Sequence, residues 1–204
     1  MGRVSDARAR LIESVPELIW AGSYGTTTID RICEKAGVKK GSFYYFFDSK
    51  AALAAASLEC EIAEKRPLWD GMFSPVIPPL DRLRHLAEHI FQHQAEIKAR
   101  FGKVLGCPLF ALGSEVCTQE STLRNQIQEI FALRRSYIES AVRDAHTQGL
   151  AHAPNPTATA QVLFAYNEGV MTQARIQDDL EPLRHLFAGY LLILGVAPES
   201  RLAA

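Results

Sequence analysis

The sequence predicts an all-α protein of about nine helices. Apolar residues recur three and four positions apart through most of the 204-residue chain, which is the spacing of one helix face. No stretch alternates apolar and polar residues in the way of a half-buried strand, and no internal repeat is visible. With 48% hydrophobic and 22% charged residues, the chain has an ordinary globular composition and can bury a full core.

The first predicted helix has a clear apolar face and ends near residues 22–23. This face consists of Leu11, Val15, Leu18 and Ile19. Pro16 falls inside the pattern, where it removes one backbone donor and crowds the carbonyl of Ile12. We therefore expect either a kink or a late start of this helix.

Residues 27–50 indicate two short helices joined by a turn, followed by the start of another helix. Thr27 is placed to cap the first of them, and Gly37 stands where a left-handed C-cap is expected. The second helix is predicted to begin near Lys39–Lys40 and is polar at its start. This is the pattern of a helix-turn-helix.

The remaining helices follow from the same periodicity. A long run of helix formers is predicted to stop near Pro67, and residues 67–79, dense in proline and glycine, are expected to form a loop. Trp69, Met72 and Phe73 of this loop are expected to pack onto the rest of the protein. Further helices are predicted over about residues 80–97, 108–116, 123–148, 157–177 and 181–195. Pro108 suits a first helical position, with Cys107 as the cap before it.

The residue types around the turn suit contact with a DNA duplex. The Lys39–Lys40 pair precedes Gly41, which lets the backbone approach a phosphate or a base edge closely. The Tyr44–Tyr45 pair offers hydroxyl groups to phosphates. The stem of Lys50 can lie on apolar surface with its ammonium at the DNA backbone. The alternative is an ordinary three-helix domain with a solvated basic turn.

The segment TTIDRICEKAGVKKGSFYYFFDSKAAL strongly resembles the DNA-binding domain of the TetR family of bacterial repressors. The resemblance implies a three-helix DNA-binding domain over residues 1–48, followed by a larger helical ligand-binding and dimerisation domain over residues 49–204. It also implies a set of DNA contacts, to which the residue types add Lys39: Thr27, Lys40, Gly41, Ser42, Tyr44, Tyr45 and Lys50. Lys40 and Ser42 are the residues expected to set base preference.

The rest of the chain resembles the regulatory half of a TetR subgroup. The matching segments are GCPLFALGSEV, TLRNQIQEIF and NEGVMTQARIQDDLEPLRHLF. The subgroup includes repressors that respond to electrophiles or small unsaturated acids, which implies release from a palindromic operator by a small inducer or an electrophile. Cys107 is the candidate sensor, because N–H groups at a helix start favour a thiolate.

A reversible ligand held in an apolar pocket is the alternative to a reactive cysteine. The aromatic residues expected to line this pocket are Phe91, Phe101, Phe110, Phe131, Tyr137, Phe164 and Tyr166. Most large aromatic residues of any globular protein belong to its core, so more than half of this set is expected to be core. The identity of the inducer is not predicted.

Apolar residues nearly encircle Leu186–Val196, which is more than a helix packed on one side needs. We therefore expect a homodimer in which the last two helices of each subunit form a four-helix interface. A monomer that hides the same face within its own body is the alternative.

Composition and charge narrow the location and the partners. The net charge is −1, but residues 1–50 hold eight basic against six acidic side chains, which favours a mildly basic DNA-binding end. The four cysteines form no C-x-x-C pair, and neither a signal peptide nor a span of ~20 apolar residues is visible. A reducing cytoplasm, with no membrane and no cofactor, is expected.

Other classes of function have weaker support in the sequence. No G-x-S-x-G, phosphate-loop or dinucleotide glycine pattern occurs, so an enzyme is not expected. His85, His89 and His93 have a spacing that zinc can use, but His85 and His89 are predicted to face solvent, so no metal site is expected. A small-molecule-binding helical protein or scaffold without sequence-specific DNA binding is the remaining alternative.

Overall fold

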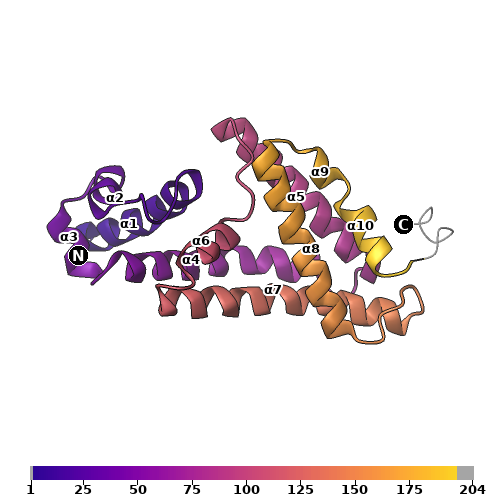
Figure 1. The fold of residues 1–204 in the computed structure, drawn as a ribbon. Helices are drawn as coiled ribbons and strands as arrows, with labels where there is room; N and C mark the ends of the chain where they lie inside the picture. Colours follow the sequence, from indigo (N-terminus) through magenta and orange to yellow (C-terminus); the bar gives the residue numbers. More distant parts are fainter. Residues whose placement is uncertain (1, 197–204) are drawn as a thin grey trace. The chain divides into compact units, whose positions relative to one another are not determined.

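The computed structural model describes residues 2–196, and every regular element within that range is a helix (Figure 1). Over this range the helices are α1 (Gly2–Ala21), α2 (Ile29–Ala36), α3 (Lys40–Phe46), α4 (Lys50–Met72), α5 (Pro79–Phe101), α6 (Pro108–Val116), α7 (Ser121–Thr147), α8 (Pro156–Gln177), α9 (Glu181–Arg184) and α10 (Leu186–Ile193). The all-α prediction is confirmed. The segment predicted as one last helix forms both α9 and α10, because a tight turn at His185 ends α9.

Packing divides the chain into two compact units. The N-terminal unit comprises residues 1–66 and 108–130, and the C-terminal unit comprises residues 67–107 and 131–204. The division falls within α4 and α7, and α6 belongs to the N-terminal unit. It differs from the boundary expected after residue 48, which stays a prediction about the extent of the DNA-binding domain.

In the N-terminal unit, α1 packs against α2, α3 and α6 around a small apolar core. Deeply buried side chains of this core include Leu11, Val15, Ile32, Phe43 and Leu53. Leu11 and Val15 belong to the apolar face predicted for the first helix. Gly37 ends α2 with φ 62°, the left-handed conformation that the sequence predicts there. The N-cap prediction is wrong by one residue, because the exposed Thr28 accepts the N–H of Arg31 while Thr27 is buried.

Pro16 does not delay the first helix, which begins at Gly2 and runs through the proline. A proline within a helix leaves the carbonyl four residues earlier without its backbone donor. Here that carbonyl belongs to Ile12, and it accepts a hydrogen bond of 3.2 Å from the hydroxyl of Ser57 on α4. The cost of the proline is thus partly offset by a bond between two helices, and the late start is a wrong prediction.

The loop predicted from Pro67 onward is also wrong in its first half, because α4 continues through Pro67 to Met72. The carbonyl that Pro67 leaves without a donor belongs to the exposed residue Ala63, so water can satisfy it. The predicted packing of the aromatic segment is confirmed, since Met72 and Phe73 are buried and Trp69 stacks on Phe73 with ring centroids 5.8 Å apart.

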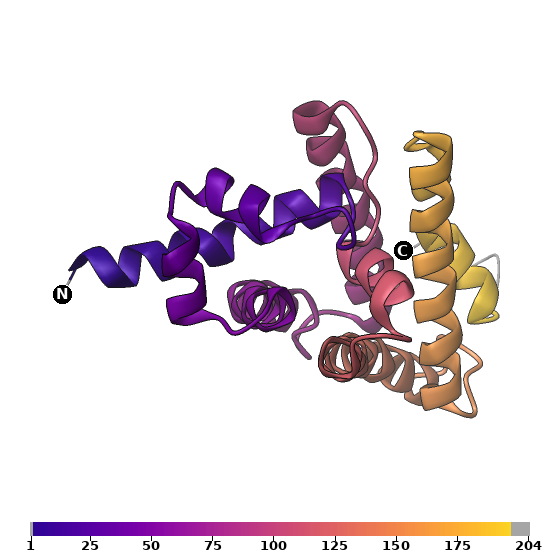
Figure 2. The same ribbon diagram turned by 60° about the vertical axis from the view of Figure 1, so that its left-hand side comes forward.

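In the C-terminal unit, α8 and α10 run side by side, as both Figure 1 and Figure 2 show, and α5 packs against α9 and α10. Gly189 of α10 permits this approach, because a Cβ at that position would lie 2.1 Å from the hydroxyl of Tyr166 on α8. Tyr190 is fully buried beside it and donates to the side-chain oxygen of Asn167 at 2.9 Å. No described helix is long and apolar enough to cross a membrane.

Candidate functional site

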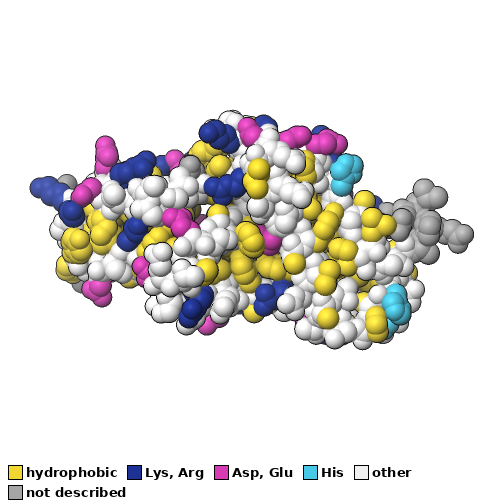
Figure 3. Space-filling model, in the orientation of Figure 1, with side chains coloured by type: hydrophobic (Ala, Val, Ile, Leu, Met, Phe, Trp, Pro, Cys, Tyr) yellow, Lys and Arg dark blue, Asp and Glu magenta, His cyan; other side chains and the backbone are white. Residues whose placement is uncertain are grey.

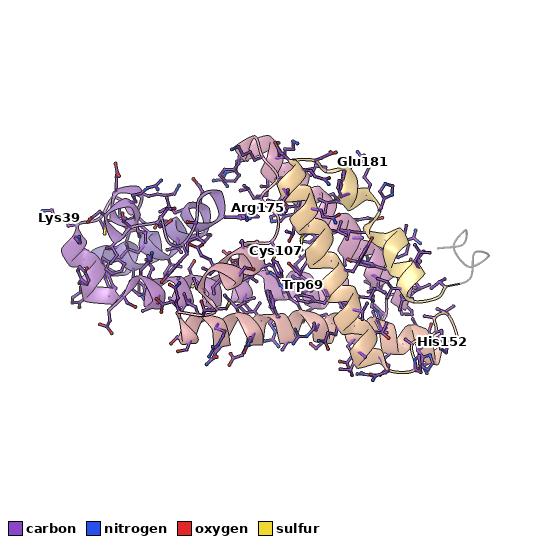
Figure 4. The ribbon with its side chains drawn as sticks, in the orientation of Figure 1. Lys39, Trp69, Cys107, His152, Arg175 and Glu181 are labelled. Atoms are coloured by element: carbon purple, nitrogen blue, oxygen red, sulfur yellow. The ribbon has the colours of Figure 1, made fainter. Side chains whose placement is uncertain are left out.

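Helix α3 has one buried side and one open side. Phe43 is fully buried in the core of the N-terminal unit. Tyr44 and Tyr45 are 53% and 75% exposed, although large aromatic side chains are normally covered. Lys39 and Lys40 at the start of the helix are exposed as well, and Lys39 points outward in Figure 4. Two rings with hydroxyl groups and two ammonium groups therefore share one accessible region.

The charge of this region is mixed rather than uniformly basic. Figure 3 shows lysine and arginine side chains among acidic ones over the part of the N-terminal unit that contains α2 and α3. The ammonium of Lys40 pairs with Asp30 at 2.9 Å, and both side chains are exposed. Hydrogen bonding and charge attraction from Asp30 raise the pKa of Lys40, which keeps this ammonium protonated. The pair places a carboxylate next to the predicted contact surface.

Gly41 lies in α3 with open space around it. A Cβ at this position would meet nothing within 4 Å, so the fold does not require glycine there. Glycine within a helix is unfavourable compared with alanine. The subunit therefore leaves room for a side chain at position 41, and the close approach of DNA to this glycine stays a prediction.

Two of the predicted DNA contacts are engaged inside the protein. Thr27 is 1% exposed and its hydroxyl donates to the carbonyl of Ser23 at 2.7 Å, whereas the neighbouring Thr28 is exposed. A DNA contact of Thr27 stays a prediction. The ammonium of Lys50 donates to the carbonyls of Tyr24 at 2.6 Å and Thr27 at 2.9 Å. These bonds favour an internal role of Lys50 over the predicted phosphate contact, which is not yet tested. The base preference expected of Lys40 and Ser42 and the phosphate contacts expected of the tyrosines stay predictions.

The turn between α1 and α2 is held from two sides within the N-terminal unit. The carboxylate of Glu115 on α6 accepts the backbone N–H groups of Tyr24 at 3.0 Å and Gly25 at 2.6 Å. Lys50 of α4 also lies 4.0 Å from the centre of the Tyr24 ring. Burial raises the pKa of Tyr24 to about 12, and Glu120 and Glu115 add to the rise. We call Glu115, Lys50 and the 24–27 turn the α6 latch.

Cys107 lies in the C-terminal unit, where Figure 4 labels it, and is only 8% exposed. The residue before it, Gly106, adopts φ 65° and exchanges two hydrogen bonds with the side chain of Gln94, at 2.8 and 3.1 Å. The guanidinium of Arg134 lies 3.7 Å from the Cys107 sulfur. Pro108 directly follows and begins α6, as the sequence predicts.

Glu168 of α8 is the unexpected member of this region. It is 2% exposed, and neither of its carboxylate oxygens has a well-formed hydrogen bond to any described residue. Burial raises the pKa of Glu168, while Arg134 and the Cys107 thiol partly lower it. Arg134 therefore acts on two buried groups of this region, the Cys107 sulfur and the Glu168 carboxyl group. We call Cys107, Arg134 and Glu168 the cysteine cluster.

The predicted pocket aromatics take part in several separate ring and cation contacts. Phe131 packs edge-on against Phe164, with ring centroids 5.1 Å apart. The other contacts of the set are Tyr137 with Trp69 and Phe73, Tyr166 with Tyr190, Phe91 beneath Arg184, and Phe101 beneath Arg100. Phe110 belongs to the N-terminal unit and is 39% exposed. Their role in ligand binding stays a prediction.

Sequence reasoning missed Arg134 and Glu168 as partners of Cys107. A signal for Glu168 was present, because a carboxylate stands in the apolar segment VLFAYNEGVM of α8. Charged residues are almost never fully buried without a partner. Arg134 gave no such signal, since α7 carries several arginines and only the packing shows which one turns toward the cysteine.

The three-helix head contains two helices joined by a glycine turn, and the helix after the turn, α3, has an exposed polar side. This arrangement defines a helix-turn-helix DNA-binding protein. Residues 12–57 match the model of the bacterial regulatory proteins of the tetR family. Residues 79–190 match that of the tetracyclin repressor-like C-terminal domain. The chain therefore belongs to the TetR family and is a DNA-binding transcriptional regulator, which supports a repressor over a scaffold without DNA binding.

Individual relatives agree with this assignment over nearly the whole chain. The transcriptional repressor NemR of Escherichia coli K12 is 29% identical over 188 residues, covering 90% of this chain and 91% of the relative. The crystal structure of regulatory protein TetR from Rhodobacter sphaeroides is 26% identical, with a TM-score of 0.78 and coverage of 90% and 96%. The reduced form of E. coli NemR has the same fold, with 24% identity, a TM-score of 0.79 and coverage of 95% and 99%.

Proposed function

We propose that this regulator is a homodimeric repressor that binds a two-fold symmetric operator through α3 and is released when Cys107 reacts with an electrophile. The exposed polar side of α3, with Tyr44, Tyr45 and the lysines before them, carries the first part. The cysteine cluster carries the second. Because its target is DNA and its four cysteines, all in the described part of the chain, form no disulfide, the proposed place of action is a reducing cytoplasm.

Enrichment of bound sequences from random or genomic DNA tests the operator. A dimer with one reading helix per subunit selects two half-sites in inverted orientation, about one helical turn or a multiple of it apart. The expected result is therefore a palindromic motif with that spacing. Enrichment of a single asymmetric motif, or of no motif, contradicts the proposal.

A second copy of the chain is the proposed cover for exposed apolar side chains on α8 and α10. Val162, Ile176 and Leu192 are 53%, 78% and 65% exposed. Ala165 and Gly169, which are small and exposed, lie on the same side of α8 as Val162 and allow close approach of a partner helix. A paired surface of this kind removes apolar area from water in both subunits.

The cysteine cluster supports a chemical route for release. As the Cys107 sulfur adds to the β-carbon of an enone or enal, the thiol proton passes to the α-carbon of the adduct, so no oxidant or reductant is needed. The guanidinium of Arg134 favours the thiolate that carries out this attack. A carbon chain bonded to a buried sulfur cannot fit without moving α7 or α8, from which Arg134 and Glu168 project.

The test compares release from operator DNA by an alkylating enone in the wild type and in Cys107→Ser. Cys60 provides the matched control, because it is an exposed thiol on α4 outside the cluster. We expect Cys60→Ser to respond like the wild type and Cys107→Ser to stay on DNA. Equal responses of all three proteins contradict the role of Cys107 and favour a reversible ligand as the inducer.

A further inference from the structure

The N-terminal unit contains an apolar cavity whose lining includes no residue of α3 and no member of the cysteine cluster. It lies between α1, α4 and α6 and has a volume of about 620 Å³. Cavities that hold small molecules are typically 300–1,000 Å³, so this one has the size for a ligand with several rings. Its apolar wall is formed mainly by Ile12, Val15, Ile19, Trp20, Leu58 and Leu112.

Charged side chains at the cavity indicate which ligands it favours. Three carboxylates and two cations line it: Glu13, Glu61, Glu64, Arg8 and Lys65. Lys65 pairs with Glu61 at 2.5 Å, and the guanidinium of Arg8 lies over the ring of Phe47 at 5.5 Å. Glu13 and Glu64 form no ion pair with any residue in the described part of the chain. The cavity thus presents an apolar wall with two available carboxylates.

We propose that this cavity binds a small hydrophobic cation. The rings of such a ligand would rest on the apolar wall, with Trp20 offering an aromatic face, and its positive charge would lie near Glu13 and Glu64. An anion of the same shape would meet an excess of carboxylates and bind weakly. This site lies outside the proposed Cys107 chemistry, so either one can fail without the other.

Binding here is expected to affect the DNA-binding head. Ile12, Val15 and Ile19 line the cavity and also belong to the buried face of α1, which packs against α2 and α3. Ser57 of α4, whose hydroxyl bonds to the Ile12 carbonyl, lines the cavity too. A ligand between these helices therefore touches the contacts that set the position of α1 against α4.

Tetraphenylphosphonium and tetraphenylborate form a suitable pair of probes, because they share their shape and differ in the sign of their charge. The chain has two tryptophans, and Trp69→Phe leaves Trp20 in the cavity as the single reporter. We expect saturable quenching of Trp20 fluorescence by the phosphonium and binding at least tenfold weaker for the borate. Equal affinity for both ions, or no saturable quenching by the phosphonium up to millimolar concentration, overturns the proposal.

Two further measurements place the probe. The double variant Glu13→Gln with Glu64→Gln should bind the phosphonium about fivefold more weakly, while Glu34→Gln with Glu59→Gln, exposed carboxylates outside the cavity, should bind it normally. The phosphonium should also slow alkylation of Cys60, which lines the cavity, and leave Cys117, which does not, unaffected. Unchanged binding in the first variant, or unprotected Cys60, assigns the cation to another site.

Discussion

At the scale of single residues, the exposure of a position separates residues that pack inside the subunit from residues that can contact DNA. Thr27 and Gly41 both lie in the segment predicted to contact DNA, yet one is buried and the other faces open space. A buried side chain is explained by the contacts it makes inside the subunit. Glycine at position 41 costs helix stability and relieves no clash inside the subunit, so its predicted role in DNA binding can be tested separately from folding.

Gly41→Ala separates folding from DNA binding. Because a Cβ at position 41 meets nothing within 4 Å and alanine favours helix, thermal unfolding should show equal or higher stability, by up to about 1 kcal/mol. Operator affinity should nevertheless fall at least tenfold, measured by fluorescence anisotropy. Gly71→Ala on α4, also open in space, is the control that keeps full affinity. Normal binding by Gly41→Ala would show that DNA does not approach this backbone closely.

Lys50→Ala distinguishes a phosphate contact from the α6 latch. Loss of a phosphate contact weakens binding and makes the dependence of log affinity on log salt shallower by about one counterion. Loss of the bonds to Tyr24 and Thr27 weakens binding at an unchanged slope and lowers thermal stability. Because its ammonium is occupied by these carbonyls, we expect the second result. The exposed Lys39→Ala should show the first.

Glu168→Gln tests whether ionisation of the buried Glu168 carboxyl group destabilises the folded protein. The pKa of Glu168 is raised in the fold, so the folded protein holds this proton more tightly than the unfolded chain. Stability is therefore lost as pH rises from the ordinary glutamate range through the raised value. The variant lacks this loss, and its melting temperature should exceed that of the wild type more at pH 8 than at pH 5. A gap independent of pH contradicts this.

At the scale of elements, the α6 latch connects the short helix α6 to the turn between α1 and α2 of the DNA-binding head. Two backbone N–H groups of the 24–25 turn depend on one carboxylate of α6, and Lys50 holds the same turn from α4. All of these groups belong to the N-terminal unit. A shift of α6 by the length of a hydrogen bond therefore reaches the segment that leads into α2.

Glu115→Gln should weaken the latch without disturbing the core. A carboxylate accepts both N–H groups, whereas an amide offers one oxygen and turns a donor toward the other N–H. We expect a loss of about 1 kcal/mol in unfolding free energy, since the group is largely exposed, together with several-fold weaker operator binding. Glu120→Gln, on the same side of the unit but without these bonds, serves as the control in both chemical denaturation and anisotropy.

At the scale of the whole molecule, the proposed dimer depends on which face of α10 is open. Apolar residues nearly encircle this helix, so the sequence does not distinguish Leu191 from Leu192, but Leu191 is 5% exposed and belongs to the core of its own subunit. Leu192 is 65% exposed. Leu192→Glu should therefore raise the dimer dissociation constant at least tenfold and lower operator affinity, while the thermal stability of the subunit stays near normal.

Sedimentation at micromolar concentration measures this directly. Leu191→Glu should unfold the subunit, because it places a charge in the core. This variant should therefore lose dimerisation and operator binding together. A wild-type protein that sediments as a monomer, or a Leu192→Glu protein that stays dimeric and binds operator normally, contradicts the proposed interface.

Local signals in the sequence were sufficient for the helical fold, the turn at Gly37 and the start of α6 at Pro108. Each depends on the conformational preferences of a few neighbouring residues, which are present before any tertiary contact forms. The periodic apolar positions also gave the core of the head, because a buried helix face repeats every three to four residues.

Only the tertiary structure decided what depends on residues far apart in the chain. Pro16 and Pro67 each leave one backbone carbonyl without its N–H donor, and whether the helix continues depends on another group that can donate to it. For Pro16 that group is the hydroxyl of Ser57, more than forty residues away in the chain. Three further features also depend on residues far apart in the chain. They are the contacts of Lys50 with the 24–27 turn, the division of α10 into buried and open sides, and the meeting of Cys107 with Arg134 and Glu168. Such pairings leave no periodic trace in a sequence, because they are set by how whole helices pack rather than by local preference.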